Sequence, residues 1–266
     1  MSSLVTLLNR EINNISSDFE VCGVVNHRGK VYSLNSDTKV LSTVFELICR
    51  PIVVSVAKQL GYEVVEPLVQ NYYPDFSLVK SVVTDEVQQA SPEFTLADSR
   101  FEKPKIAVDI KTTYRNSRNK FNYTLGGYAS FIRPSSERKN IVFPFSDYQK
   151  HYIIGFVYSR GKKSNRDSPF VYPVDELDNV PVPIENIEFF VQEKWRIAGD
   201  RAGSGNTTNI GSITGTIDDF REGKGPFRSE KEFLTYWRGY ERTAEQRAAA
   251  YSNLAEFRRF QQRRRI

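Results

Sequence analysis

Two carboxylates and one lysine in the first half of the chain are the residue types needed to hydrolyse a phosphate ester. Asp109 and Lys111 flank Ile110 in a stretch that alternates apolar and polar side chains, and Asp75 follows Pro74 upstream. On a β-strand, residues i and i+2 point to the same face about 7 Å apart. The sequence therefore predicts an acid and an amine presented together on one face of a strand.

The spacing acid-x-lysine is not specific by itself, because it occurs four times in this chain, at Asp37, Asp109, Glu137 and Glu222. The triplet at Asp37 opens a helical pattern, where capping explains it. Those at Glu137 and Glu222 lie in a serine-rich turn and a glycine-flanked loop, where charges are solvated. The Asp109 triplet is the one that lies on an alternating strand.

The ligand types available favour a hard metal ion over zinc. The chain has two histidines and two cysteines, whereas carboxylate oxygens are the ligands that Mg²⁺ prefers. Such an ion polarises a phosphodiester and lowers the pKa of bound water, and Lys111 would position that water and offset negative charge in the transition state. The alternative is structural: Asp75 is a turn acid, and Asp109 forms an ion pair with Lys111.

Glu46 is a third candidate acid. It lies on the polar face of a helical pattern that Ser36 or Asp37 can cap. A helix packed beside the sheet would bring Glu46 to the same metal site, and the alternative is a solvated glutamate.

The elements that must position these residues are visible as helical and strand periodicities. We expect a helix over 4–15, a hairpin of 19–25 with 30–34, a helix from 38 that Pro51 interrupts before a second stretch ends at Gly61, and helices from about 229 onward. Strand patterns cover 62–66, 73–79, 105–113, 123–132, 140–143, 153–158 and 187–191.

Three loops have distinctive compositions. Residues 202–215 are rich in Gly, Asn and Thr, whose small polar groups match base edges; no Gly-Lys-Ser/Thr follows, so this loop is not a P-loop. A generic flexible loop is the alternative. Residues 81–104 are acidic and are expected to form a surface loop or a hairpin excursion, and residues 159–170 are expected to form a basic loop.

The charge distribution points to a polyanionic partner. The chain of 266 residues has a net charge of +5, and beyond residue 237 eight arginines against three glutamates account for all of it. A solvated helix end is the alternative. No apolar run approaches the ~20 residues that span a bilayer, no secretory leader is visible, and Cys22 and Cys49 form no disulfide framework. We expect a soluble protein of a reducing compartment.

Several longer stretches match a known family. They are SDTKVLSTVFEL at 36–47, QNYYPDFSL at 70–78, DIKTTY at 109–114, TLGGY with SFIR within 124–133, AGDRAGSGNTTNIGSI at 198–213, and YWR with YERT at 236–243. Along nearly its whole length the chain resembles the EcoRV-type type II restriction endonucleases of the PD-(D/E)xK nuclease superfamily. The loop GSGNTTNIGS and the stretch SDTKVLST carry most of the specificity.

The resemblance implies an α/β (α+β) fold with a mixed central β-sheet flanked by helices, assembled as a U-shaped homodimer. It implies one restriction-endonuclease domain over 1–266. Within it, 1–35 contribute to dimerisation, 36–160 form the catalytic sheet region, and 185–266 hold the DNA-recognition loop and the C-terminal helices.

The resemblance also implies residue roles. Asp75, Asp109 and Lys111 form the catalytic core with Glu46 as an auxiliary acid, and Asp75, Asp109 and Glu46 bind the metal. The implied DNA-binding residues are a major-groove loop, a minor-groove pair and flanking polar residues: Gly203, Ser204, Gly205, Asn206, Thr207, Thr208, Asn209, Gln70, Asn71, Thr38, Lys39, Thr112 and Thr113.

The activity that follows is Mg²⁺-dependent cleavage of both strands of double-stranded DNA, at a GATATC-like palindrome with a blunt central cut. The protein would act in the bacterial cytoplasm within a restriction-modification system, with a cognate DNA methyltransferase. The chain departs from the family pattern at Tyr72, where histidine is expected, at Asn122, where lysine is expected, and in the insertion 81–104. Two alternatives remain open, a structure-selective or repair nuclease and a non-catalytic DNA-binding protein.

Overall fold

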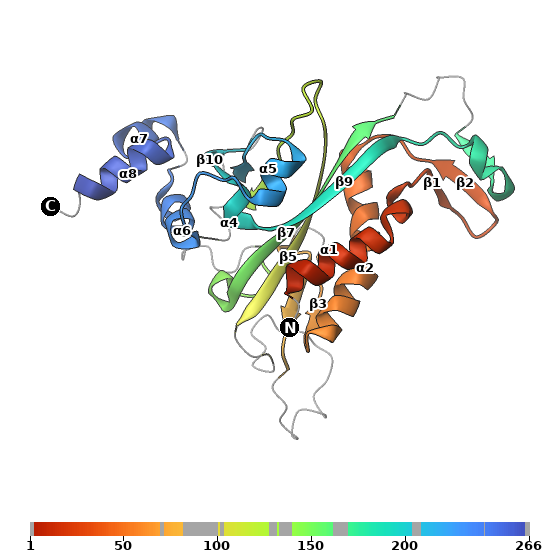
Figure 1. Cartoon of the computed structure of the whole chain (residues 1–266), viewed down its shortest axis with the longest axis horizontal. Helices are drawn as coiled ribbons and strands as arrows, with labels where there is room; N and C mark the ends of the chain where they lie inside the picture. The colour runs from red at the N-terminus through yellow and green to blue at the C-terminus, as the bar shows by residue number, and fades with distance from the viewer. Residues whose placement is uncertain are drawn as a thin grey trace.

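The structure is a computed structural model that describes residues 3–69, 72–81, 101, 104–127, 132, 140–161, 170–203, 209–241 and 243–263. Figure 1 shows a central sheet with two helices against one face, a small strand arm at one end of the longest axis and the C-terminal helices at the other. The chain therefore places two accessory units on opposite sides of one core.

The central sheet has five strands in the order β3-β4-β5-β7-β9. Their bounds are Glu63–Val65, Phe76–Val79, Lys105–Tyr114, Tyr148–Arg160 and Ile184–Glu193. β5 and β7 run parallel, while the other neighbouring pairs are antiparallel. The expected mixed sheet is confirmed, and Phe76 on β4 lies opposite Val108 on β5.

Helices α1 (Leu4–Asn14) and α2 (Thr38–Gln59) cover one face of this sheet. Asp37 caps α2 as expected, because its side chain accepts hydrogen bonds from the backbone N–H groups of Lys39 at 2.8 Å and Val40 at 3.3 Å. The buried faces of both helices are apolar, and they pack on β4, β5 and β7. This packing fixes where the polar face of α2 emerges beside the sheet.

The expected break at Pro51 is wrong, because α2 continues through it. Pro51 is exposed, while Cys49, Ile52 and Val53 around it are buried. The burial of this apolar stripe outweighs the one backbone hydrogen bond that proline removes. α2 also has the length and composition of a membrane-crossing helix, a test that core helices pass as well.

Both faces of β5 are covered, so the expectation that one face simply presents charge is wrong in part. Val108 and Ile110 pack toward α1 and α2. Ala107, on the other face, belongs to a second core built with the C-terminal third of the chain. Asp109 alternates with Val108 and Ile110 and is itself buried.

A three-stranded sheet in the order β1-β2-β8 forms the arm at one end of Figure 1. Its strands are Gly23–Val25, Lys30–Ser33 and Val171–Pro173, preceded by the 3-10 helix η1 (Ser16–Phe19) and followed by η5 (Val174–Asn179). The predicted hairpin is confirmed from Gly23 onward, although Phe19 belongs to η1. β8 was not predicted.

A second small sheet has the order β10-β11-β6, with strands Ala198–Ala202, Asn209–Ser212 and Thr124–Gly127. It pairs the segment predicted as a polar loop with a strand from the middle of the chain. The predicted strand at 140–143 does not form. Ile141 makes an isolated bridge with Tyr73 instead, and the 3-10 helix η4 (Phe145–Asp147) leads into β7.

The C-terminal third contains α4 (Lys194–Ile197), α5 (Ile217–Glu222), α6 (Glu230–Gly239), α7 (Ala244–Ala249) and α8 (Leu254–Arg263). The expected helices beyond 229 are confirmed. Tyr236, Trp237, Tyr251 and Phe257 are buried and pack ring against ring. Of the predicted loops, 81–104 and 159–170 lie largely outside the described residues, apart from an antiparallel bridge between Ser81 and Phe101.

Candidate active site

Asp75 lies immediately before β4 and reaches across to β5. Its Oδ2 accepts a hydrogen bond of 2.6 Å from the backbone N–H of Ile110. The pairing of Phe76 with Val108 explains this contact, because it brings the start of β4 beside the middle of β5. Two acids that are far apart in the sequence are thus held next to each other by strand pairing.

Lys111 and Asp109 form an ion pair with 2.7 Å between Nζ and Oδ2, and Lys111 Nζ also donates to the carbonyl of Ile110 at 3.0 Å. The Asp109 side chain is 4% exposed and that of Lys111 is 25% exposed. The Asp109 carboxylate is therefore enclosed, while the Lys111 side chain is partly exposed. The predicted acid and amine do share one site.

Glu46 lies on α2, which packs on β5, and the charges of the β5 pair act on it. Ser42 donates a hydrogen bond to Glu46 Oε1 at 3.4 Å, one helical turn away. The pKa of Glu46 is raised, first because the side chain is partly buried and then by Asp109, while Lys111 lowers it. The charges of Asp109 and Lys111 therefore both act on Glu46, which would not be so for a fully solvated glutamate.

Electrostatic crowding is the main property of this cluster. The pKa of Asp75 is well above its usual range because of burial and because of the negative charges of Asp109 and Glu46; Lys111 and the N–H of Ile110 oppose the rise. Burial acts to lower the pKa of Lys111, but the surrounding carboxylates outweigh it and raise that pKa. Lys111 is therefore a permanent cation, suited to donate hydrogen bonds rather than to accept a proton.

The donor set suits a divalent cation that prefers oxygen ligands. Asp75, Asp109 and Glu46 are all carboxylates. Burial, and after it the negative charge of Asp109, raises the pKa of Asp75 and of Glu46, and a bound cation would favour their ionised forms. Within the described ranges, no three acid, histidine or cysteine side chains are already gathered at metal-binding distance. The fit therefore rests on two adjacent aspartates, with Glu46 nearby.

The flanking polar residues lie on the two elements that also carry Glu46 and Lys111. Thr38 and Lys39 begin α2, with Lys39 exposed, and Thr112 and Thr113 continue β5 beyond Lys111 and are partly exposed. Gln70 and Asn71 lie outside the described residues.

The predicted recognition loop joins β10 to β11. Its ends, Gly203 and Asn209, are described, and the N–H of Gly203 donates to the carbonyl of Asn209 at 2.8 Å. Ser204, Gly205, Asn206, Thr207 and Thr208 lie outside the described residues. β11 pairs in turn with β6, where Asn209 lies opposite Gly127. The loop is therefore mounted on a small sheet rather than on an isolated turn.

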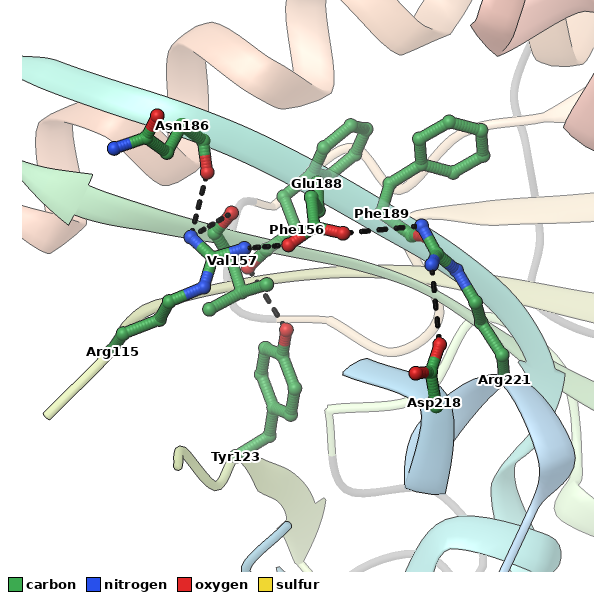
Figure 2. Close-up of polar contacts among 9 residues, drawn as sticks. All are labelled: Arg115, Tyr123, Phe156, Val157, Asn186, Glu188, Phe189, Asp218 and Arg221. Carbon is green, nitrogen blue, oxygen red and sulfur yellow. Dashed lines mark hydrogen bonds and ion pairs between the residues drawn. The ribbon is translucent and has the colours of Figure 1, made fainter. Parts of the chain in front are cut away.

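Sequence reasoning missed a polar network at the far end of β5, shown in Figure 2. Arg115 donates to the carbonyls of Asn186 at 2.6 Å and Val157 at 3.4 Å and pairs with Glu188. Glu188 also pairs with Arg221 of α5 at 3.6 Å. The catalytic strand, β9 and α5 are thereby joined, and no spacing in the sequence indicates this.

Lys194 is a second residue that sequence reasoning missed. It is the first residue of α4, only 3% exposed, and its Nζ lies 4.1 Å from the centre of the Tyr73 ring. Tyr73 in turn hydrogen-bonds through its hydroxyl to His151 Nδ1 at 2.7 Å. A buried cation thus lies beside the segment that ends at Asp75.

The chain matches one family of known proteins over most of its length. The family model described as "Restriction endonuclease EcoRV" matches residues 15–87 and 81–262. The type II restriction enzyme EcoRV of Escherichia coli is 50% identical over 241 residues, which cover 90% of this chain and 90% of that protein. All the described residues of the site lie within the matched ranges.

Among solved structures, the NlaIV restriction endonuclease aligns with 96% of this chain and 83% of its own, at 11% identity and a TM-score of 0.38. A likeness of that size is too weak to support an inference about this site.

Proposed function

The chain belongs to the restriction endonuclease EcoRV family, and from that premise we propose that it cuts both strands of a GATATC-like palindrome in a reaction that requires Mg²⁺. The observation that supports this mechanism is that Asp75, Asp109 and Lys111 come together. Asp75 accepts a hydrogen bond of 2.6 Å from the backbone N–H of Ile110, and the neighbouring Asp109 and Lys111 form an ion pair of 2.7 Å. The protein is a site-specific deoxyribonuclease.

In the proposed mechanism, Asp75 and Asp109 hold the metal ion and Glu46 assists them. When bound, Mg²⁺ supplies a polarised phosphate oxygen and a water of lowered pKa. Lys111 keeps its proton, orients the attacking water through its N–H donors and offsets the charge that develops on the phosphate. Because Asp109 is enclosed, its charge interacts with these groups more strongly than it would in open water.

Recognition is assigned to elements next to the cluster. We assign base contacts in the major groove to Gly203–Asn209 and minor-groove contacts to Gln70 and Asn71, which precede the Asp75 segment. Thr38, Lys39, Thr112 and Thr113 then contact the backbone. This division agrees with the general rule that phosphate contacts fix the register while base contacts carry the sequence information.

The proposed homodimer is supported by the arm β1-β2-β8. Val24 and Val25 of β1 are 54% and 53% exposed, and Phe170, Val171, Val174 and Leu177 are exposed near β8 and η5. These exposed apolar side chains all belong to one small unit, and such residues favour association with another surface. A two-fold dimer would supply one catalytic cluster to each strand of a palindrome. Residues 1–35 carry part of this surface, in line with their expected role in dimerisation.

We also propose that residues 1–266 form a single domain. The protein would act in the bacterial cytoplasm, together with a methyltransferase that protects the host's own sites.

One experiment tests the whole proposal: incubate the protein with plasmid DNA and Mg²⁺, and sequence the fragment ends. Blunt ends within GATATC support it. Cuts at branched or damaged sites without a common sequence would instead indicate a structure-selective nuclease. Tight binding to one sequence without any nicking would indicate a non-catalytic DNA-binding protein. Asp109→Asn, which keeps the size of the side chain, serves as the inactive control.

A further inference from the structure

Asp200 connects the strand that enters the recognition loop to two C-terminal helices. It lies on β10, three residues before Gly203, where the loop begins. Its backbone carbonyl accepts a hydrogen bond of 2.5 Å from the Tyr236 hydroxyl of α6. Its Oδ2 accepts a hydrogen bond of 2.9 Å from the backbone N–H of Leu254, the first residue of α8. One residue of β10 therefore contacts both helices directly.

These contacts arise where β10 departs from regular pairing. Between its paired ends β10 advances from Ala198 to Ala202, whereas the opposite stretch of β11 runs only from Ser212 to Ile210. The extra residues form a bulge, and a bulge changes the direction of the groups within it. Asp200 lies in the middle of this stretch, which explains why a residue of the strand reaches the helices.

The contact with α8 is a helix cap supplied from a distant part of the chain. The first N–H groups of a helix have no partner within the helix, and a carboxylate at that end also interacts favourably with the helix dipole. Asn253 supplies a local cap, because its Oδ1 accepts a hydrogen bond of 3.0 Å from the N–H of Glu256. α8 is therefore capped once by its own neighbour and once by Asp200 of β10.

α8 carries charges that suit the DNA backbone. Arg259 and Arg263 are both exposed on this helix, while Arg258 pairs with Glu232 of α6 at 2.8 Å and joins the two helices. Exposed arginines neutralise phosphates without regard to sequence. A helix suited to bind phosphates is thus tied, through Asp200, to the strand that enters the recognition loop.

We propose that Asp200 is a positioning residue for specificity, which holds α8 and its exposed arginines in one orientation relative to the recognition loop. The inference rests on the proposed function, with base contacts made by the loop and phosphate contacts by the arginines. Groups held in one rigid unit engage the target together, without a further cost of ordering them. On random DNA the arginines bind phosphates whether or not the loop is aligned. Loss of the Asp200 carboxylate should therefore weaken specific binding selectively.

The test compares Asp200→Ala with the matched control Asn253→Ala. Each variant removes one cap of α8, but only the first removes its contact with β10. Steady-state cleavage of a GATATC duplex in Mg²⁺ gives KM and kcat, and a scrambled duplex added as a competitor gives its inhibition constant. We expect Asp200→Ala to raise KM about fivefold, the effect of a lost helix cap expressed as a ratio of binding constants. The inhibition constant should stay unchanged, and Asn253→Ala should keep the wild-type ratio of the two constants.

A second measurement needs no DNA. Hydrogen exchange followed by mass spectrometry reports separately on the amides of 198–203 and of 254–258. Asp200→Ala should speed exchange in both segments, because the contact that joins them is lost. Asn253→Ala should speed it in α8 alone. Asp200→Asn, which keeps an acceptor oxygen, should return both the exchange and the KM toward the wild-type values.

The inference would be overturned by a wild-type ratio of inhibition constant to KM in Asp200→Ala, or by faster exchange confined to α8. Either result leaves the proposed function intact. If Asp200→Ala does not fold, Asp200→Leu, which fills the space without an acceptor, decides in the same two measurements. If the wild-type protein cuts no duplex, the proposed function fails, and the inference about Asp200 fails with it.

Discussion

The Asp75 carboxylate accepts a hydrogen bond from the backbone N–H of Ile110 at 2.6 Å. Asp75 is therefore joined to β5, the strand that carries Asp109 and Lys111, before any metal ion binds. The bond links the residue before β4 to β5 and places the Asp75 carboxylate against the backbone of Ile110, the residue between Asp109 and Lys111 in the chain. It also stabilises the ionised form of a carboxyl whose pKa burial and neighbouring acids raise. The geometry of the pair is therefore set by the sheet.

Replacing Lys111 by methionine should abolish most of the cleavage activity without preventing binding. The loss of a cationic donor aimed at the developing charge costs about 10²–10³-fold in rate. Single-turnover cleavage of a GATATC duplex measures the rate, and a gel-shift assay in the absence of Mg²⁺ measures binding. Lys58→Met, at an exposed position in the last turn of α2, is the control and should cut normally. Cleavage by Lys111→Met at a rate near that of the wild type would remove Lys111 from the mechanism.

The stability of the protein should fall as the pH decreases below about 6.5, in part because of His151. The pKa of His151 is well below its usual value because the ring is buried and lies near Lys194. A group whose folded pKa is lowered contributes stability above its unfolded pKa and loses it as the pH falls. One such group changes the free energy of unfolding by up to about 1.4 kcal/mol per pH unit.

His151→Gln should flatten that slope and keep an acceptor for the Tyr73 hydroxyl. Urea unfolding at a series of pH values measures the change. Asp75 and Glu46 act with the opposite sign, because their raised pKa values contribute stability at low pH that is lost as the pH rises. An unchanged slope in His151→Gln would mean that His151 binds its proton equally in the folded and unfolded states and does not contribute to the pH dependence.

Asn206→Ala should weaken specific DNA binding by about 1–3 kcal/mol and leave binding to random DNA unchanged, as expected when a hydrogen bond to a base edge is removed. Titration of a GATATC duplex and of a scrambled duplex at the same salt concentration measures both. Equal losses on the two duplexes would show that the residue supports the loop and does not read bases.

Val25→Asp on the arm should convert the proposed dimer to monomers and reduce double-strand cleavage. The residue is 53% exposed on β1, and a charge there disfavours an apolar association surface. Sedimentation velocity measures the mass. Val54→Asp on α2, where the valine is also exposed, provides the matched control. A wild-type protein that sediments as a monomer at micromolar concentration would argue against this surface.

The arginine tail should govern the salt dependence of DNA binding. Deleting α8 is a poor test, because Phe257 is buried and Arg258 pairs with Glu232 at 2.8 Å. Replacing Arg259, Arg263, Arg264 and Arg265 by glutamine avoids that damage. The slope of log affinity against log salt should then become shallower by about 0.9 for each phosphate that an arginine no longer neutralises, with the cut site unchanged. An unchanged slope would make the tail a solvated helix end.

The cluster of Asp75, Asp109 and Lys111 was accessible from the sequence because strand alternation fixes which side chains share a face. The cap at Asp37 and the first helix were accessible for a similar reason, since local spacing determines them. What the pattern did not reveal was burial on both faces of β5. The apolar residues that cover the second face come from the C-terminal third, and no local periodicity reports that contact.

The roles of Lys194 and Arg115 could not be predicted from the sequence for the same reason. Each acts through partners that are distant in the sequence, Tyr73 for Lys194 and Glu188 for Arg115. The continuation of α2 through Pro51 also depends on tertiary packing, which overrode the local preference. Residues whose roles depend on long-range contacts therefore needed the structure, whereas those set by neighbours did not.

The closure of the recognition hairpin has an engineering consequence. Because the N–H of Gly203 donates to the carbonyl of Asn209 at 2.8 Å, a main-chain hydrogen bond joins the two ends of the loop. Libraries randomised at 204–208 with the length kept constant would leave these two anchor residues unchanged. Selection from such libraries could redirect the enzyme to new target sequences without rebuilding the catalytic sheet.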